Sequence, residues 1–332
     1  MRIGITGISG SLGTALTARL VEAGIGPIIG ITRDEFKAET IGNRYGGVGG
    51  QVRCMVVSEG INNTSKLTEV FRGCDTLIHC AALKRISGSV YAAEEMMQTN
   101  VVGTMSVLHA ATAAGIGKVL VISSDKAVEP CNLYGATKMV AEGLAVQQNS
   151  FSYPRGCRIA VARYGNVAGS RGSVIPLWKE QFARGEMLAV THMEMVRFMI
   201  TMNQAVEFIM ACLFSMRGGE IMLPILPSAR MYDVALAICG DASRIKMLNQ
   251  LRPGGEKLSE IMVSQEEPVR TVQRTLQGGF GGPIDAYMVL PSHRSWSSEP
   301  YPGKLVPPGF TYRSDTNSLW LTANELKEVV QG

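Results

Sequence analysis

Charged and aromatic side chains are scarce in this sequence, and long apolar runs are absent. Of the 332 residues, 18% are charged and 6% are aromatic, and the formal net charge is only +4. The lysines and arginines are scattered, which argues against a nucleic-acid-binding stripe and a polybasic membrane anchor. The longest apolar run, 208–214, is far shorter than the roughly 20 residues that a membrane-spanning helix needs. The expected partner is therefore a small molecule, with no nucleic acid and no membrane.

Cysteine and histidine are present but show no disulfide or metal pattern. No two cysteines form a C-x-x-C pair and their number is odd, which argues against a disulfide framework and a zinc site. The four histidines lack metal-ligand spacing, so no metal is predicted. The first 13 residues contain four glycines and no continuous apolar segment of a signal peptide. We therefore expect a cytoplasmic protein with reduced thiols at Cys54, Cys74, Cys80, Cys131, Cys157, Cys212 and Cys239.

Short apolar stretches alternate with segments of helical periodicity through the first half of the chain. This alternation is typical of βαβ units and predicts an α/β, Rossmann-like, doubly wound parallel sheet. The expected strands are 2–6, 28–32, 51–57, 76–80, 118–123 and 158–163, and the expected helices are 11–23, 65–71, 102–114 and 133–148.

After residue 166 the pattern loosens into glycine and proline clusters, with one clear helical stretch at 201–214. We expect a Rossmann domain at 1–167, with later contributions from about 196–225. A smaller, interleaved substrate domain is expected at 168–195 and 226–332, the latter including a C-terminal extension. Residues 278–310 are rich in Gly, Pro and Ser and are predicted to form a long surface excursion, and only 322–330 regains helical character.

A glycine-rich turn directly follows the first expected strand. Gly7 allows a tight turn, Gly10 lets the backbone approach a pyrophosphate, and Gly13 allows close packing of helix on strand. The N–H groups and the dipole of the following helix favour an anion at its N-terminus. The position between strand and helix therefore predicts a dinucleotide-binding loop, with contacts from Gly7, Ser9, Gly10, Ser11, Leu12 and Gly13.

The end of the second expected strand bears on the choice of cofactor. An NAD enzyme usually places a carboxylate there to bind both ribose hydroxyls, but this position holds Thr32. Arg33 comes next, and its guanidinium can form paired hydrogen bonds with a 2′-phosphate. The sequence therefore favours NADP over NAD. The alternative is that Arg33 is a solvated loop residue.

Polar residues after the fifth expected strand and on the next helix form a candidate catalytic group. Ser124-Asp125-Lys126 follows the strand, and Tyr134 and Lys138 lie four residues apart on one helix face. A lysine ammonium beside a tyrosine, with an oxidised nicotinamide nearby, lowers the tyrosine pKa and makes Tyr134 a usable base. Burial and the same positive charges are expected to lower the pKa of Lys126. The alternative for Asp125-Lys126 is a surface ion pair.

In this order the motifs resemble those of the extended short-chain dehydrogenases/reductases, and within them the inverting UDP-N-acetylglucosamine 4,6-dehydratases of pseudaminic-acid and capsular polysaccharide synthesis. The resemblance covers about residues 1–265 and a tail at 314–322. It is carried by Ala81-Ala82-Leu83-Lys84, Thr99-Asn100, Ser123 to Lys126, Asn132 to Lys138, Arg163 to Val167, Gly169 to Pro176, Arg197-Phe198, Gly218 to Ile221 and Arg252 to Leu258.

This resemblance implies an internal redox cycle, in which NADP accepts a hydride from C4 of the sugar, water leaves across C5 and C6, and the hydride returns to C6. Tyr134 would remove the C4 hydroxyl proton, Lys138 would hold the nicotinamide ribose, and Ser124 would bond the C4 oxygen. Asp125 would protonate the departing C6 hydroxyl. Lys126 would take the C5 proton before reprotonation on the opposite face inverts C5. Retaining dehydratases have an acidic pair after the serine or threonine, so the lysine points to inversion.

The resemblance also implies contacts outside this group. Further cofactor contacts are implied for Ala81, Ala82, Lys84, Asn100, Ser123 and Tyr164. The sequence departs from the family pattern at Val57-Ser58-Glu59, where an adenine-contacting aspartate is customary, and at Gly254-Gly255, which carries one glycine more than usual.

The expected substrate is a UDP-linked amino sugar. Asn166, Ser173 and Val174 follow a strand at the carboxyl edge of the sheet, where ligands of such folds bind. Arg252 is expected to neutralise the UDP diphosphate, with Glu256 on the uridine ribose, or else the two form a loop salt bridge. Lys84 is expected to line the same pocket as well as to contact the cofactor.

Other functions stay open from the sequence alone. A UDP-sugar 4-epimerase or C5 epimerase shares the glycine loop and the pair Tyr134 and Lys138, and differs in whether C6 loses its hydroxyl. A non-catalytic dinucleotide sensor has the same fold, because fold alone does not establish catalysis, but such sensors commonly lack the tyrosine and the lysine. A homo-oligomer is expected, as for most soluble enzymes.

Overall fold

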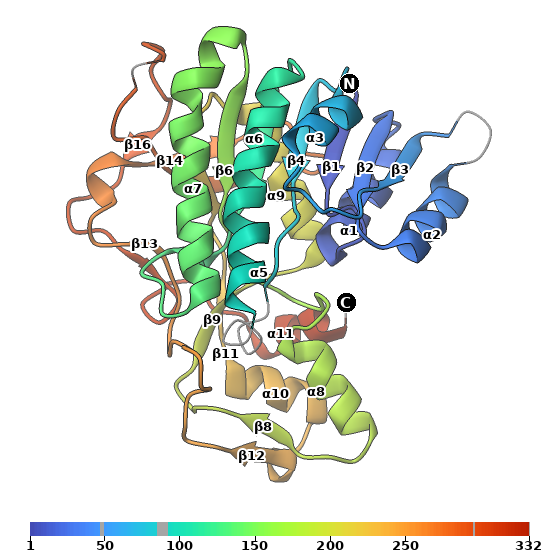
Figure 1. Cartoon of the computed structure of the whole chain (residues 1–332). Coiled ribbons are helices and arrows are strands. Elements are labelled where there is room, and N and C mark those ends of the chain that lie inside the picture. The colour runs from blue at the N-terminus through green and yellow to red at the C-terminus, as the bar shows by residue number, and fades with distance from the viewer. Residues whose placement is uncertain (47–49, 85–91, 295, 332) are drawn as a thin grey trace.

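The structure is a computed structural model that describes residues 1–46, 50–84, 92–294 and 296–331. Figure 1 shows a large central sheet with helices over both faces and a smaller lobe beside it, which holds the C-terminus. The predicted α/β, Rossmann-like fold with a smaller C-terminal part is confirmed.

Ten strands of the described residues form the large sheet, in the order β16-β14-β15-β10-β6-β5-β4-β1-β2-β3. β1 to β6 and β10 run parallel, whereas β15, β14 and β16 add antiparallel pairs at one edge. β1 and β2 are rich in isoleucine and buried throughout, as expected for parallel strands covered by helices. The bounds are β1 (Ile3–Thr6), β2 (Ile28–Thr32), β3 (Val52–Val56), β4 (Thr76–His79), β5 (Lys118–Ile122), β6 (Arg158–Ala162), β10 (Ile221–Pro224), β14 (Thr271–Leu276), β15 (Ile284–Val289) and β16 (Lys304–Leu305).

The strand order reverses beside β1, which pairs with β2 on one side and with β4 on the other. At such a reversal the loops beyond the two strands turn apart and leave a crevice, where ligands of doubly wound sheets bind. The glycine loop after β1 and residues 80–84 after β4 therefore border this crevice.

Helices cover both faces of the sheet (Figure 1). On one face α3, α6 and α7 lie side by side, and α1 packs against α9 on the other. Buried Ala141 and Ala145 let the long helix α7 lie close to its neighbours, because small side chains permit a close approach. The bounds are α1 (Ser11–Glu22), α2 (Glu35–Tyr45), α3 (Thr64–Phe71), α5 (Ala93–Met97), the π-helical turn η1 (Gln98–Val102), α6 (Gly103–Ala113), the 3-10 turn η2 (Asp125–Ala127), α7 (Leu133–Ser152), the 3-10 turn η3 (Tyr153–Arg155) and α9 (Met202–Ser215).

A second hydrophobic cluster forms the core of the smaller lobe. It includes Trp178, Leu188, Val234 and Leu326, from four different elements, and each large side chain buried there stabilises the lobe by about 1.5–3 kcal/mol. The lobe and its connections contain β7 (Asn166–Val167), α8 (Val174–Ala183), β8 (Leu188–Val190), β9 (Val196–Ile200), β11 (Ser228–Arg230), α10 (Met231–Cys239), η4 (Ala242–Arg244), β12 (Ile245–Met247), β13 (Ile261–Val263), η5 (Pro268–Arg270), β17 (Tyr312–Arg313) and α11 (Ala323–Gln331). β9 lies between β11 and β7, while β12 pairs with β8 and β13 with β17.

Residues 278–310 differ most from the expectation. The prediction of a surface excursion is wrong for 284–289, because β15 pairs with both β10 and β14 and buries Ala286, Met288 and Val289. β14 and β15 thus extend the large sheet, although 226–332 was assigned to the smaller domain. The domain boundaries themselves stay a prediction.

Several features expected to have no ligand role lie in the scaffold. His79 is buried with its ring nitrogens 2.7 Å from Thr6 Oγ1 and 3.0 Å from Thr104 Oγ1, and burial lowers its pKa to about 3. It therefore joins β1, β4 and α6 as a neutral group.

All seven cysteines are unpaired. The described residues contain no group of three or more side chains placed to hold a metal, and no helix among them is long and apolar enough to cross a membrane.

Candidate active site

The glycine loop has the geometry that a bound pyrophosphate requires. Gly7 has a φ of 68°, and a Cβ there would lie 2.9 Å from the backbone of Ala81. A Cβ on Gly13 would lie 2.4 Å from the carbonyl oxygen of Gly7, so α1 can begin this close to the loop only with glycine. Gly10 is the N-cap of α1, and the first N–H groups of a helix are free to bind an anion. Gly7 and Gly13 have the backbone roles that their spacing predicts.

A cavity of about 420 Å³ runs from this loop past the carboxyl ends of β2, β3 and β4. With a phosphate loop at one end and polar groups along its length, it suits an elongated anionic ligand such as a dinucleotide. Six of the predicted cofactor residues line it: Gly7, Ser9, Gly10, Arg33, Ala81 and Ala82. Ser11 and Leu12 do not, since the Ser11 hydroxyl accepts from the Arg171 N–H at 3.0 Å and Leu12 packs on the core.

Arg33 lies on the wall of the cavity at the end of β2, together with Lys37. Its side chain is 54% exposed and its Nη1 lies 3.7 Å from Glu95 Oε1, so the guanidinium is free to move toward a ligand. The hydroxyl groups of Thr32 and Ser9 form a hydrogen bond, with 2.8 Å between their oxygen atoms. At the position where the family has its adenine-contacting aspartate, Val57 and Glu59 line the cavity.

The predicted catalytic residues of the β5 end lie in one hydrogen-bonded group. Ser124 Oγ donates to Asp125 Oδ1 at 2.8 Å, and Lys126 Nζ donates to the same oxygen at 3.0 Å. Asp125 is 0% exposed. The alternative of a surface ion pair for Asp125 and Lys126 is therefore wrong.

The Lys126 ammonium has two hydrogen-bond acceptors and a second carboxylate as an ion-pair partner. Besides Asp125, its Nζ lies 3.2 Å from Glu260 Oε1 and 3.3 Å from Asn166 Oδ1. Burial alone lowers the pKa of Lys126, but the carboxylates of Asp125 and Glu260 outweigh it and raise the pKa above the ordinary lysine value. For the protein alone the prediction of a lowered pKa is wrong, because it did not count the charges of Asp125 and Glu260.

Tyr134 and Lys138 lie on the buried side of α7. Burial raises the pKa of Tyr134, against the lowering effect of the Lys126 charge and the Ser124 hydrogen bond. Lys138 Nζ donates to the Ile122 carbonyl at the end of β5, and burial lowers its pKa to about 8. In the protein alone, burial thus raises the tyrosine pKa, and the cation that lowers it is Lys126 instead of the predicted Lys138. The effect of an oxidised nicotinamide stays a prediction.

Asn100 serves the scaffold instead of the cavity wall. It is 1% exposed and lies in the π-helical turn η1. Its amide donates to Leu83 O at 2.9 Å and to Thr137 Oγ1 at 3.0 Å, and its oxygen accepts from Leu83 N at 2.8 Å. With these bonds Asn100 holds the loop after β4 against α7, and its predicted cofactor contact stays a prediction.

Several buried polar atoms near the catalytic group have no hydrogen-bond partner in the described part of the chain. They are Ser123 Oγ, Asp125 Oδ2, Ser173 Oγ and Glu260 Oε2. Buried polar atoms in proteins are nearly always paired, so unpaired ones mark places where water or a ligand binds. Tyr164 is also buried, and its carbonyl accepts from the Asp125 N–H at 3.0 Å.

Of the predicted substrate residues near β7, Asn166 contacts this group directly. Asn166 holds Lys126, as described above, while Ser173 and Val174 form the start of α8. Lys84 Nζ donates to Ser170 Oγ at 3.4 Å, and its pKa is lowered by burial and by the charges of Lys126 and Arg171. This is a positively charged environment suited to a phosphate.

Arg252 and Glu256 contact each other, with the Arg252 Nε 3.7 Å from Glu256 Oε1. The loop salt bridge is therefore present, and Arg252 remains 55% exposed at its side chain. The loop lies against the catalytic segment, since Asn132 Nδ2 donates to Gly255 O at 2.9 Å. A Cβ on Gly255 would lie 2.1 Å from Cys131 O, which accounts for a glycine here.

Sequence reasoning missed Glu260 and assigned no role to Arg197. Both are buried, and Arg197 Nε lies 3.6 Å from Glu260 Oε1. The available signal was an acidic residue directly before the apolar Ile261–Val263, because a charge at the start of a buried strand needs a partner.

A buried ion network elsewhere joins α7 to the C-terminal half. Arg163 Nη2 lies 2.6 Å from Glu142 Oε2 and 3.2 Å from Glu267 Oε1. The network anchors η5 behind the catalytic helix.

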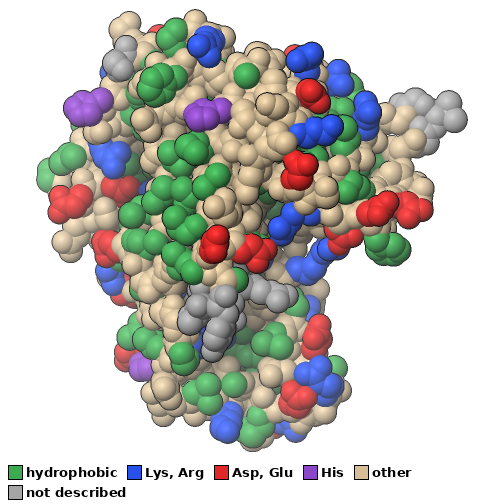
Figure 2. All heavy atoms as spheres, viewed as in Figure 1, with side chains coloured by type: hydrophobic (Ala, Val, Ile, Leu, Met, Phe, Trp, Pro, Cys, Tyr) green, Lys and Arg blue, Asp and Glu red, His purple; other side chains and the backbone are tan. Residues whose placement is uncertain are grey.

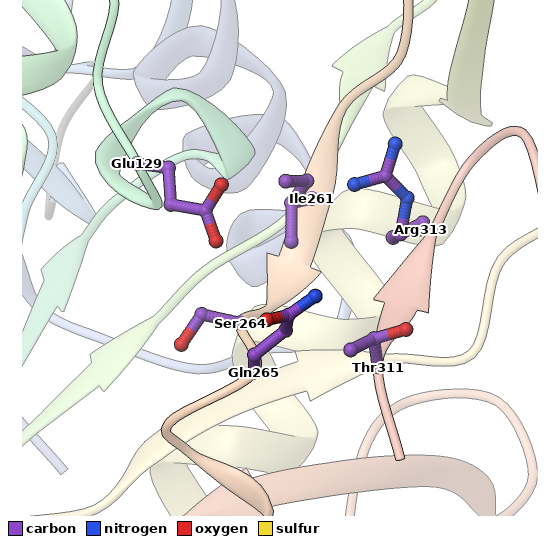
Figure 3. Close-up of a pocket in the computed structure, with 6 residues that line it drawn as sticks. All are labelled: Glu129, Ile261, Ser264, Gln265, Thr311 and Arg313. Carbon is purple, nitrogen blue, oxygen red and sulfur yellow. The ribbon is translucent and has the colours of Figure 1, made fainter. Parts of the chain in front are cut away.

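A second, smaller cavity of about 150 Å³ lies between the segment after η2 and the β13–β17 pair. Figure 3 shows Glu129 on one side and Arg313 on the other. Arg313 Nη2 is already paired with Asp315 Oδ2 at 2.9 Å. No predicted site residue is among the described residues that line it.

Comparison with known proteins adds evidence that is independent of this geometry. Residues 3–276 match the family described as polysaccharide biosynthesis protein. The chain is 34% identical to the UDP-N-acetylglucosamine 4,6-dehydratase (inverting) of Campylobacter jejuni, over 98% of this chain and 96% of that protein. It is 33% identical to the UDP-glucose 4-epimerase of Rickettsia canadensis, over 79% of this chain and 77% of that protein.

Solved structures with the same fold include Pen from Bacillus thuringiensis. It has a TM-score of 0.86 and 26% identity, with 99% of this chain and 96% of that chain covered. DesIV, a dTDP-glucose 4,6-dehydratase from Streptomyces venezuelae with NAD and DAU bound, has a TM-score of 0.68 and 20% identity over 77% of this chain and 86% of that one. The likeness to DesIV shows a shared fold.

Proposed function

Since this chain belongs to the polysaccharide biosynthesis protein family, among the extended short-chain dehydrogenases/reductases that act on nucleotide sugars, we propose that it is an NADP-dependent UDP-N-acetylglucosamine 4,6-dehydratase that inverts C5. Its product is a UDP-linked 2-acetamido-2,6-dideoxy-4-keto-hexose for surface polysaccharide or glycan synthesis. The observation that carries the proposal is the hydrogen-bonded group of Ser124, Asp125 and Lys126, next to Tyr134.

The residues of the cavity fit a nicotinamide dinucleotide. The loop 7–13, including the backbone of Ser11 and Leu12, would hold the pyrophosphate at the N-terminus of α1. Arg33 and Lys37 would bind the 2′-phosphate of NADP, and Thr32 offers no carboxylate that would favour NAD. When bound, the nicotinamide supplies the oxidation of C4 and the later reduction of C6.

At C4, Tyr134 takes the hydroxyl proton and Ser124 donates a hydrogen bond to the oxygen. The Lys126 charge already lowers the pKa of Tyr134, and the positive charge of an oxidised nicotinamide acts in the same direction. Lys138 holds the nicotinamide ribose from the buried side of α7.

At C5 and C6, Asp125 and Lys126 act as acid and base. In the structure Lys126 donates to Asp125 and Asn166 and forms an ion pair with Glu260, which corresponds to an ammonium beside an ionised Asp125. A shift of one proton from Lys126 Nζ to Asp125 Oδ1, 3.0 Å away, leaves Lys126 neutral and Asp125 protonated, which are the states that the base and the acid need. The neutral amine then takes the C5 proton, the Asp125 proton leaves with the C6 hydroxyl as water, and both groups return to their charged forms.

The UDP group is proposed to bind between the smaller lobe and the catalytic group. Arg252 is exposed enough to pair with the diphosphate, and Glu256 lies beside it for the uridine ribose. Ser173 and Val174, at the start of α8, offer a hydroxyl and N–H groups to a phosphate. Lys84 adds a positive charge to this region.

A homo-oligomer is proposed from the surface of α7 and its neighbours. Figure 2 shows hydrophobic side chains gathered over α7. Met139 and Val140 of this helix are 47% and 40% exposed, and Met105 of α6 is 39% exposed. Apolar patches of this kind mark interaction sites, and homo-oligomers pair the same patch from two copies. Light scattering of the wild type and of Val140→Glu tests this, because the variant should be smaller.

Proton NMR of the purified protein with UDP-N-acetylglucosamine in D2O, with no added NADP, tests the function. The expected product is a 6-deoxy-4-keto sugar with inverted C5 and deuterium at C5. A product that keeps its C6 hydroxyl and changes only at C4 would instead establish a 4-epimerase, which the Rickettsia canadensis relative makes the second candidate.

A further inference from the structure

Glu260 is a buried carboxylate on the catalytic group that comes from the far half of the chain. It is 3% exposed, lies directly before β13, and its backbone N–H donates to Ser314 Oγ at 2.9 Å. Its Oε1 lies 3.2 Å from Lys126 Nζ, and its Oε2 is buried with no partner in the described part of the chain. A carboxylate this deep in the protein requires a positive partner, and Lys126 is the nearest one.

Arg197 of β9 holds Glu260 from the other side. Its guanidinium is 5% exposed and donates to the carbonyls of Lys257 and Leu258 at 2.8 and 3.0 Å. These bonds fix Arg197, so Glu260 Oε1 is placed between two cations, at 3.6 Å from Arg197 and 3.2 Å from Lys126.

The charged and titratable groups that face Lys126 come from five elements. They are Asp125 on η2 itself, Glu260 before β13, Arg197 on β9, Lys84 after β4 and Tyr134 on α7. Asp125 has a partner in the proposed reaction, the departing C6 hydroxyl. Glu260 has no such partner among the reacting groups, so the proposed reaction does not explain why a second carboxylate lies beside Lys126.

We propose that Glu260, fixed by Arg197, sets the charge state of Lys126 and so the pH range in which C5 is deprotonated. Glu260 is a positioning residue, because it acts through Lys126 and touches no reacting atom. It stabilises the ammonium form, in which Lys126 donates to Asp125 and Asn166 and pairs with Glu260. It also favours uptake of the C5 proton by Lys126, because that step restores the ammonium. This inference rests on the proposed function for its consequence at C5, but its effect on Lys126 is measurable without substrate.

The direct test is competitive labelling of Lys126 with acetic anhydride across pH, read by mass spectrometry of the peptide that contains it. Only a neutral amine reacts, so the labelling midpoint reports the charge state. In Glu260→Gln the midpoint should fall by about 1–3 pH units, the shift expected when an opposite charge a few ångströms away is removed. Glu260→Asp keeps the carboxylate and should restore most of the wild-type midpoint.

Glu267→Gln is the matched control, because Glu267 is also a buried carboxylate paired with an arginine, Arg163, but does not contact Lys126. It should cost stability and leave the Lys126 midpoint unchanged. If Glu260→Gln does not fold, the Lys126 labelling midpoint is measured in Arg197→Gln instead. It removes a positive charge that lowers the pKa of Lys126, so the midpoint should rise. An unchanged midpoint in whichever variant folds overturns the proposal.

Deuterium exchange at C5 separates this inference from the proposed function. In Glu260→Gln the rise of the exchange rate with pH should move to lower pH by the same amount as the labelling midpoint, while oxidation of C4 continues. A shifted labelling midpoint with no reaction of the wild type on UDP-N-acetylglucosamine would refute the function and leave the role of Glu260 standing. If the wild type reacts but the labelling midpoint of Glu260→Gln is unshifted, the proposed function stands and the role of Glu260 is refuted.

Discussion

Replacement of Lys126 by alanine removes the group on which the elimination step depends. Its ammonium lies 3.0 Å from Asp125 and 3.2 Å from Glu260, and both carboxylates are almost completely buried. Removing one partner of a buried ion pair costs about 3–5 kcal/mol, because the other charge stays buried and uncompensated. For a chain of this size the melting temperature should fall by on the order of 5 °C.

A second substitution tests whether this stability loss comes from the interaction of Lys126 with Glu260. Adding Glu260→Gln to Lys126→Ala removes a carboxylate that has already lost one of its two cationic partners, so the double variant should lose less stability than the sum of the two single variants. A double-mutant cycle from denaturant unfolding measures this coupling. If the two losses simply add, Lys126 and Glu260 do not interact in solution.

The effect on the reaction is selective. Oxidation of C4 uses Tyr134 and Ser124, whereas loss of the C5 proton uses Lys126. With substrate added, Lys126→Ala should therefore still produce the NADPH absorbance band, but should neither release water nor exchange the C5 proton with D2O. Stopped-flow absorbance and NMR report the two steps separately. Deuterium entering C5 at the wild-type rate would refute Lys126 as the base and remove the main support for inversion.

Three further predictions use other parts of the site. Tyr134→Phe should stop the reaction before C4 is oxidised, so stopped-flow absorbance should show no NADPH transient, and a normal transient would require a different base. The purified protein should carry NADP, identified by extraction and mass analysis, and finding only NAD would contradict the role of Arg33. Lys138→Met should abolish activity yet raise the melting temperature at pH 7, because burial lowers the Lys138 pKa to about 8 from an ordinary 10.5. Between pH 8 and 10.5 the Lys138 side chain is protonated in the unfolded wild type and neutral in the folded one, so the wild-type free energy of unfolding should rise with pH. The stability that Lys138→Met gains over the wild type should shrink over the same range. A gain that does not depend on pH would contradict the lowered pKa of Lys138.

The first half of the fold was predictable because its signals are local. Strand β2 was predicted with its observed ends, 28–32, since a buried parallel strand is a continuous apolar run between polar turns. The glycine loop was equally readable, because Gly7 and Gly13 are needed by backbone geometry within a few residues of each other.

The later elements were missed for the opposite reason. β15 lies between glycine- and proline-rich segments, and what makes it a strand is its pairing with β10 and β14, which no short window contains. Helix α8 has Pro176 in its first turn, where proline is tolerated but obscures the helical pattern. α2, with Phe36 exposed, has no clear apolar face to reveal it.

The same distinction explains the error at Lys126. Burial and the expected cofactor argued for a lowered pKa, whereas the carboxylates of Asp125 and Glu260 reverse the sign, and Glu260 approaches from β13 in the other half of the chain. Lys257 and Gly255, from the same half, also contact the catalytic segment, through Val128 O and Asn132. In the proposed reaction the Rossmann half thus supplies the reacting groups, and the later half adds a charge that acts on Lys126. Enzymes that share the glycine loop and the tyrosine–lysine pair can therefore differ in reaction through residues far along the chain, and Glu260→Gln is the substitution in this protein that isolates that effect.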